Sequence, residues 1–121
     1  MKKILVAEDD AFLIKVYGAK LSKEGFEVKI AKDGSEVAML LQDFTPDIML
    51  IDLIMPKKDG FSVLEELKAQ EKYKNIPILV TSNLGQPEDK QKALNLGAIE
   101  YLVKSDTPLA MIIEKIQEYT K

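Results

Sequence analysis

The chain contains no cysteine and no histidine among its 121 residues. Without cysteine it cannot form a disulfide, hold a metal through thiolates or use a thiol as a nucleophile. Without histidine it has no imidazole base and cannot carry a phosphohistidine of its own. Chemistry at any site in this chain must therefore use carboxylates, hydroxyls, lysines and a hard cation.

Long hydrophobic runs and an excess of basic residues are also missing. The apolar run that follows Lys2 and Lys3 has only four residues, too few for a signal peptide, and no run could cross a bilayer. We therefore expect a cytoplasmic protein that does not insert into a membrane. The net charge of −3 gives no sign of the basic surface that direct binding to nucleic acid needs. At this length the chain fits one domain, residues 1–121.

Five short apolar runs predict five strands. Residues 4–7, 48–51 and 78–80 are unbroken apolar runs, which are typical of strands covered on both faces. Residues 26–30 alternate between apolar and charged side chains, and residues 101–103 form a short run near the end of the chain. We expect these two weaker strands at the edges of the sheet.

Five segments with helical periodicity alternate with those strands. Their apolar stripes lie within residues 13–21, 37–44, 61–70, 87–96 and 109–116. Gly25 and Gly97 fall where helices should end, because glycine readily takes the left-handed conformation that closes a helix. Asp33 and Asp59 stand where their side chains can cap the first amides of a following helix.

This α/β alternation predicts a single flavodoxin-like (βα)5 fold. The sheet is expected to be doubly wound and parallel, with the strand order 2-1-3-4-5 and helices on both faces. In such a sheet a ligand binds beyond the carboxyl ends of strands 1 and 3, where the winding direction reverses. The fold therefore indicates where a site should lie before any motif is considered.

Acidic side chains from two distant parts of the chain follow those two strands. Glu8, Asp9 and Asp10 end the first strand, and Asp52 ends the third. An acidic cluster after a strand is by itself more often a solvated loop or a helix cap. Converging carboxylates repel one another, however, and a divalent cation relieves that repulsion best. Ligands that are all oxygen favour Mg²⁺ or Mn²⁺ over Zn²⁺.

Two further strand ends point to the same place. Thr81 closes the fourth strand and Lys104 the fifth, although each alone would be interpreted as an ordinary strand residue or a surface lysine. With the acids they can stabilise a phosphoryl group, because phosphoryl transfer depends mainly on positioning and on positive charge around the transferred group. In that interpretation the metal and Lys104 supply charge, Thr81 a hydrogen bond and Asp52 the attacking oxygen.

These residues lie in four segments that resemble the receiver domains of bacterial two-component response regulators, and the resemblance covers essentially the whole chain. The segments are residues 4–10, 52–60, 80–82 and 101–104. The segment from Asp52 to Gly60 is highly specific for this family, and the occurrence of all four segments in this order is more specific still. The resemblance implies a phosphorylation-dependent signalling switch of a phosphorelay, whose partner-binding surface changes when it is phosphorylated.

For the site, the resemblance implies that Asp52 accepts the phosphoryl group. It implies that Asp9, Asp52 and the backbone carbonyl of Ile54 ligate Mg²⁺, while Glu8 acts mainly through bound water. In the family the acidic pair directly follows the strand. Asp10 therefore falls outside the metal shell and is better interpreted as the cap of the first helix.

The resemblance also assigns the switch and the partners. Thr81 is expected to turn toward the phosphoryl group, Tyr101 to follow inward and Lys104 to pair with the phosphoryl oxygens. Outside the family context, Tyr101 would be interpreted as a half-buried aromatic residue of an edge strand. The expected donor is a histidine kinase or a histidine phosphotransfer protein. An effector protein is expected to dock on the fourth helix, fifth strand and fifth helix. The only enzymatic activities expected are self-phosphorylation from small donors and autodephosphorylation.

The chain departs from the common family pattern at a few positions. Ser105 stands where many members have a proline after a cis peptide, which leaves the geometry of that peptide open. Ser82 stands where the smaller alanine is frequent, and this can alter access to the site. Ile54 and Asn83 lie where side chains influence dephosphorylation, so the phosphoryl lifetime does not transfer from the family.

Three other functions share parts of the pattern. A flavodoxin-like electron carrier needs a loop rich in glycine or hydroxyls after the first strand, where this chain has Glu8, Asp9 and Asp10. An aspartate-nucleophile phosphatase typically has a second acid two residues after the nucleophile, where this chain has Ile54. A receiver-like module that is never phosphorylated stays open, although such a module usually loses one member of the set of acids, threonine and lysine. The sequence also leaves open whether the receiver stands alone or is part of a longer regulator.

Overall fold

The computed structural model describes all 121 residues and has five strands and five helices in the predicted alternation. The strands are β1 (Lys3–Ala7), β2 (Glu27–Ala31), β3 (Ile48–Asp52), β4 (Ile78–Ser82) and β5 (Glu100–Val103). The helices are α1 (Ala11–Lys23), α2 (Gly34–Leu41), α3 (Gly60–Lys68), α4 (Pro87–Asn95) and α5 (Leu109–Tyr119). None of these helices is long and apolar enough to span a membrane.

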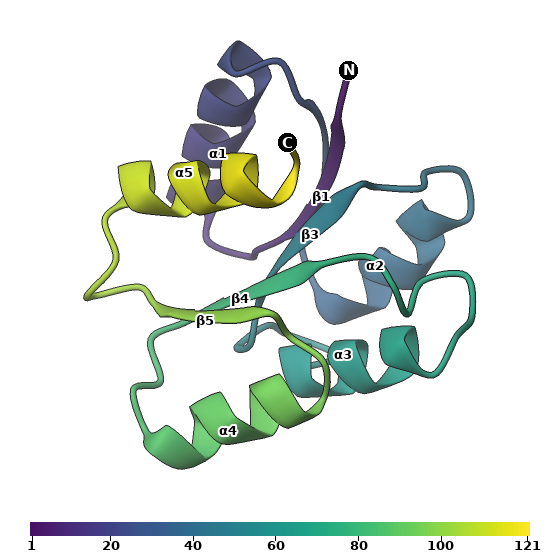
Figure 1. Cartoon of the computed structure of the whole chain (residues 1–121), viewed down its shortest axis with the longest axis vertical. Helices are drawn as coiled ribbons and strands as arrows, with labels where there is room; N and C mark the ends of the chain where they lie inside the picture. Colours follow the sequence, from purple (N-terminus) through teal and green to yellow (C-terminus); the bar gives the residue numbers. More distant parts are fainter.

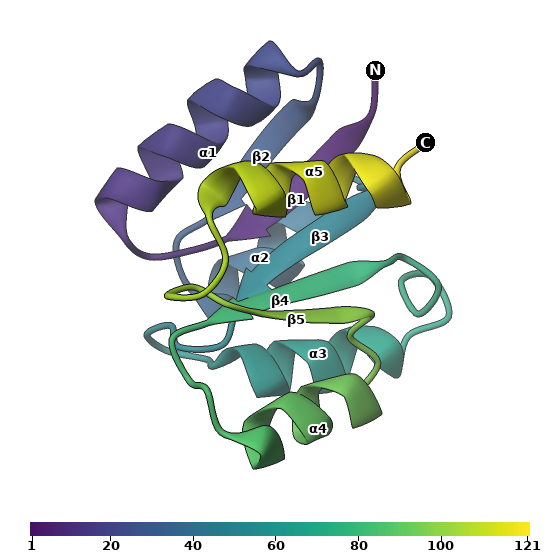
Figure 2. The ribbon, with the colours of Figure 1, turned by 60° about the vertical axis from the view of Figure 1, so that its left-hand side comes forward.

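The strands form one parallel sheet in the order β2-β1-β3-β4-β5, which confirms the predicted flavodoxin-like arrangement with β2 and β5 at its edges. Helices α1 and α5 cover one face, whereas α2, α3 and α4 cover the other (Figure 1; Figure 2). Each face has its own apolar cluster. On β1, Ile4 and Val6 pack on the side of α1 and α5, while Leu5 and Ala7 pack on the opposite side.

The predicted helix ends are confirmed. Asp10, Asp33 and Asp59 are the N-cap residues of α1, α2 and α3, and each side chain accepts a hydrogen bond from an amide of the first turn. Gly25 and Gly97 have φ angles of 93° and 111°, in the left-handed region that favours glycine. Local chemistry thus fixes where these helices begin and end.

Two element boundaries differ from the prediction. The predicted stripe extended to Phe44, but α2 ends at Leu41. Phe44 nevertheless packs in the same apolar cluster as Leu41, from the connection that leads to β3. Phe26 is likewise buried but precedes β2. Periodicity cannot separate an apolar residue on an element from one that lies beside it and turns into the same core.

The beginning of α2 packs directly against the connection between β3 and α3. A Cβ atom added at Gly34 would overlap the carbonyl oxygen of Lys58 in that connection. Asp33 also forms an ion pair, at 3.6 Å, with Lys57, whose backbone is left-handed with a φ of 69°. Because this connection directly follows Asp52, its contact with α2 helps to fix the rim of the predicted site.

We expect the substitution Gly34→Ala to lower the free energy of unfolding by roughly 1–3 kcal/mol, because the added methyl group meets backbone that cannot move aside. Gly85→Ala is the matched control, since no atom lies within 4 Å of the Cβ position at Gly85. The control should stay within about 0.5 kcal/mol of the wild type. Urea unfolding of the three proteins measures both effects. Equal stability of the two variants would show that the contact at Gly34 is not tight.

Candidate functional site

Acidic and basic side chains from three strands meet at the carboxyl end of the sheet. Glu8 follows β1, Asp52 is the last residue of β3, and Lys104 follows β5. The Nζ atom of Lys104 lies 2.9 Å from Oε1 of Glu8 and 2.9 Å from Oδ2 of Asp52. Thr81 is buried and is the register partner of Asp52 on β4. One cation therefore bridges two carboxylates where the winding direction of the sheet reverses.

Burial controls the electrostatics of this bridge. Glu8 is 1% exposed and Asp52 is 4% exposed. Burial raises the pKa of Glu8, and the hydrogen bonds from Lys104 and from the amide of Asp10 offset only part of that shift. Burial alone would lower the pKa of Lys104, but its hydrogen bonds to Glu8 and Asp52 outweigh this and leave the pKa raised. Lys104 is therefore a permanent positive charge at neutral pH.

Asp9 places a third carboxylate close to the two that Lys104 bridges. One oxygen from each of Glu8, Asp9 and Asp52 lies within 4.8 Å of the others. Such a set of oxygen atoms suits a hard divalent cation, and these carboxylates outnumber the single ammonium group of Lys104. Asp10 instead caps α1. The structure thus gathers the carboxylates of the predicted metal site, whose role as ligands stays a prediction.

A polar cavity of about 240 Å³ opens beside these carboxylates. Its lining residues are Glu8, Asp9, Asp10, Asp52, Ile54, Asn83 and Lys104. The backbone amide of Ile54 donates a hydrogen bond to Oδ1 of Asp52 at 3.2 Å, while the residue as a whole is 56% exposed. Ile54 therefore belongs to the site through its backbone, and its side chain lies at the rim.

The predicted switch residue Tyr101 faces the interior. The residue is 8% exposed, and its hydroxyl donates a hydrogen bond to the carbonyl oxygen of Leu84 at 2.6 Å. The amide of Leu84 in turn donates a hydrogen bond to the hydroxyl of Ser82 at 3.0 Å. No sequence signal marks Leu84, because both contacts use its backbone atoms, which every residue type has.

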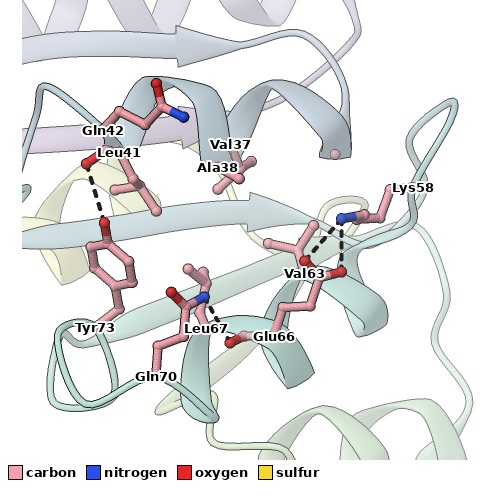
Figure 3. Close-up of a pocket in the computed structure, with 11 residues that line it drawn as sticks. Val37, Ala38, Leu41, Gln42, Lys58, Val63, Glu66, Leu67, Gln70 and Tyr73 are labelled. Carbon is pink, nitrogen blue, oxygen red and sulfur yellow. Dashed lines mark hydrogen bonds and ion pairs between the residues drawn. The ribbon is translucent and has the colours of Figure 1, made fainter.

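A second cavity of about 240 Å³ lies between α2 and α3 and has a different character (Figure 3). The apolar side chains of its lining are Val37, Ala38, Leu41, Val63, Leu67 and Tyr73. At its edge Lys58 forms an ion pair with Glu66 at 2.7 Å, and the hydroxyl of Tyr73 donates a hydrogen bond to the carbonyl oxygen of Leu41. These polar groups are already paired, and no cluster of metal-binding side chains lies there. The chemistry therefore belongs to the carboxyl end of the sheet.

Comparison with known protein families decides what kind of domain this is. The family model described as the response regulator receiver domain matches residues 4–117, almost the whole chain. The chain belongs to the response regulator receiver family. It is a phosphorylation-dependent signalling switch of the kind that two-component systems use, and the family implies a phosphodonor and an effector as partners.

Similar full-length proteins are much longer than this receiver. It is 35% identical over 118 residues to the gliding motility regulatory protein of Myxococcus xanthus, covering 98% of this chain and 15% of that protein. It is 36% identical over 104 residues to the DNA-binding dual master transcriptional regulator RpaA of Synechocystis, covering 86% of this chain and 43% of that protein. The chain thus spans less than half the length of either relative.

Solved structures of receivers share the fold. The chemotaxis response regulator CheY4 of Vibrio cholerae superposes with a TM-score of 0.89 at 29% identity, covering 98% of both chains. The receiver domain of the Francisella response regulator 1452 also gives a TM-score of 0.89, at 30% identity, covering 98% of this chain and 96% of that one. The Mn²⁺-bound form of the response regulator Rcp1 gives 0.81 at 29% identity, covering 92% and 86%.

The geometry of the peptide bond before Ser105, which the sequence left open, is visible in the structure. All peptide bonds are trans, including the bond between Lys104 and Ser105. The side chain of Lys104 nevertheless reaches both Glu8 and Asp52. The bridge is thus formed next to a trans peptide bond.

In EDTA we expect Asp9→Asn to raise the free energy of unfolding by a few tenths to about 1 kcal/mol. The substitution removes a charge that repels Glu8 and Asp52, and solvent screening keeps the gain small. The gain should narrow or reverse in Mg²⁺, because a cation relieves the same repulsion. Urea unfolding in both buffers measures this, with Asp43→Asn, exposed after α2, as the control. A gain of the same size in the control would place its cause outside the site.

Proposed function

We propose that Asp52 is the phosphoacceptor of this receiver, which we take to be one domain over residues 1–121. The observation that carries the proposal is the bridge in which Lys104 holds the buried Asp52 carboxylate beside a positive charge. In the proposed step, an oxygen of Asp52 attacks the phosphorus atom of a phosphohistidine. A P–O bond forms as the P–N bond breaks, and the imidazole nitrogen of the donor keeps the electron pair.

The phosphohistidine of the donor lies outside this chain, because the chain has no histidine. We propose a histidine kinase or a histidine phosphotransfer protein, whose imidazole would reach Asp52 through the polar cavity. The receiver would have no enzymatic activity beyond self-phosphorylation from small donors and autodephosphorylation. We also propose that the receiver acts in the cytoplasm.

The metal of the site is proposed to be Mg²⁺, with Mn²⁺ as a possible substitute. Asp9, Asp52 and the backbone carbonyl of Ile54 would hold the ion, and Glu8 would act mainly through bound water. The three clustered carboxylates support this set, since oxygen ligands suit a hard cation. When bound, the ion would supply positive charge that neutralises the oxygens of the transferred group. The Mn²⁺-bound Rcp1 structure is consistent with a divalent metal in this family.

Lys104 and Thr81 would complete the site. After transfer, the ammonium group of Lys104 would pair with phosphoryl oxygens instead of bridging two carboxylates. Thr81 lies beside Asp52 in the sheet register and would turn its hydroxyl toward the new acceptor. A shift of Thr81 would be transmitted through β4 to Tyr101 on the neighbouring strand, so Thr81 and Tyr101 form the proposed switch pair.

The effector is proposed to dock on the surface of α4, β5 and α5. Two observations support this choice: β5 is an edge strand, and α4 buries only Ala93. Tyr101 lies on β5 and contacts the connection before α4, so its position can alter this surface. Direct binding to nucleic acid is not proposed, because the chain carries a net negative charge.

Incubation with acetyl phosphate should add one phosphoryl group to the wild type in Mg²⁺ and none in EDTA. Asp52→Asn should gain no adduct in either buffer, because the substitution removes the attacking oxygen. Intact-mass spectrometry of the four samples measures both dependences.

Each other outcome has a specific meaning. An adduct that persists in Asp52→Asn would assign the acceptor role to another carboxylate. If no adduct forms in the wild type, even with a histidine-phosphorylated donor protein, the domain is a binding module that signals without phosphorylation.

We expect Lys104→Ala to slow phosphorylation by about 10²-fold while Mg²⁺ still binds, because the substitution removes charge from the transferred group but no metal ligand. Phosphorylation rates come from the same mass assay, and calorimetry measures Mg²⁺ affinity. Lys74→Ala is the control, since Lys74 forms an exposed ion pair with Glu71 away from the site. Wild-type phosphorylation rates in Lys104→Ala would contradict the role proposed for this residue.

A further inference from the structure

Successive residues at the end of β4 face opposite sides of the sheet. Val80 packs in the apolar cluster under α2, α3 and α4, whereas Leu79 packs in the cluster under α1 and α5. The alternation of a strand then directs Thr81 to the α1 side, beside Asp52, and Ser82 to the α4 side. Two adjacent residues thus connect the phosphoacceptor with the opposite face of the sheet.

Ser82 is fully buried and makes contacts through both its backbone and its side chain. Its carbonyl oxygen accepts a hydrogen bond from the amide of Lys104 at 2.8 Å. Its hydroxyl accepts one from the amide of Leu84 at 3.0 Å. The carbonyl oxygen of Leu84 accepts a third hydrogen bond, at 2.6 Å, from Tyr101. We call the two side-chain bonds on the backbone of Leu84, from Ser82 and Tyr101, the Leu84 clasp.

The Leu84 clasp is what ties the connection between β4 and α4 to the sheet. Its two bonds are the hydrogen bonds that join residues 83–86 to a strand. The following helix adds little, because Gln86 gives it no side-chain cap and only Ala93 of α4 is buried. Asn83, next to Leu84, lines the cavity beside Asp52. Fixing Leu84 therefore fixes the mouth of the acceptor site as well as the start of α4.

The chemistry of the clasp suits a stable contact. Burial raises the pKa of the Tyr101 hydroxyl, although Ser82 offsets part of that shift, so the group stays protonated and can donate at neutral pH. An alanine at position 82 would keep the packing volume of the β-carbon but would leave the Leu84 amide without its acceptor. The hydroxyl of Ser82 is thus the part of the clasp that a smaller residue cannot replace.

We infer that Ser82 is a positioning residue whose hydroxyl keeps the Leu84 clasp closed, with Tyr101 turned inward, before Asp52 is phosphorylated. As a regulatory device this rests on the proposed function of Asp52 and Thr81. Before phosphorylation, the equilibrium between inward and outward positions of the Tyr101 ring would then already favour the inward position. Phosphorylation would therefore move the ring less than in a chain with alanine at position 82.

The test is nuclear magnetic resonance of the full chain, with Ser82→Ala, Ser82→Thr and the exposed control Ser62→Ala. In Ser82→Ala we expect exchange of the Leu84 amide to accelerate about fivefold, the shift in an opening equilibrium that one hydrogen bond accounts for. The ring signals of Tyr101 should move in the same variant. Ser82→Thr, which keeps a hydroxyl, should restore both readouts, and Ser62→Ala should change neither.

Phosphorylation by acetyl phosphate provides the second readout. The ring signals of Tyr101 should shift more on phosphorylation in Ser82→Ala than in the wild type. Unchanged Leu84 exchange in Ser82→Ala, or equal Tyr101 shifts in both proteins, would overturn the inference.

If Ser82→Thr does not fold, Tyr101→Phe replaces it as the second variant. The effects of Tyr101→Phe and Ser82→Ala on Leu84 exchange should be less than additive when the two substitutions are combined. Full additivity would contradict a single clasp. If neither acetyl phosphate nor a histidine-phosphorylated donor protein gives a phosphoryl adduct, the role of Asp52 is refuted, while Leu84 exchange still tests the clasp.

Discussion

The crowding of buried carboxylates at the ends of β1 and β3 is the constraint on which the site depends. Glu8 and Asp52 are both buried, and the ammonium group of Lys104 is the positive charge that lies between them. This lysine is 96 residues from one partner and 52 from the other. Since β4 separates β5 from β3, and both β3 and β4 separate it from β1, the bridge forms only when these four strands pair in their native order. The ion pairs of Lys104 therefore depend on the folding of strands that are far apart in the sequence.

The same constraint explains why the site can act as a switch. An ion bridge between one ammonium group and two carboxylates would be disturbed if one of them became an acyl phosphate, which has more charge and more acceptor oxygens. Thr81 is adjacent to Asp52 in register, and Ser82 follows it on the opposite face. A change on the α1 side of β4 thus reaches the α4 side within one residue, through covalent geometry and not through a long chain of contacts.

The sequence predicted most of what local physics determines. Apolar periodicity located all ten elements, and Asp33, Asp59 and Gly97 marked helix ends because capping depends on residue type. It also placed Glu8, Asp52 and Lys104 at one crevice, since parallel strands end on the same side. It could not predict contacts that use backbone atoms, such as those of Leu84, or the packing of Phe44 outside its helix. Such contacts depend on how connections fold over the core, and no periodic pattern records that.

Helix α4, part of the proposed docking surface, is only loosely attached to the sheet that carries the site. It buries only Ala93, so its apolar contact with the sheet is small, and Gln86 gives its first turn no side-chain cap. Elements with few buried contacts are the ones that open locally or move in a protein, and α4 is such an element. Two hydrogen bonds on Leu84 join the connection before this helix to the sheet. We therefore expect a change at the end of β4 to displace α4 more readily than α5, which buries three isoleucines.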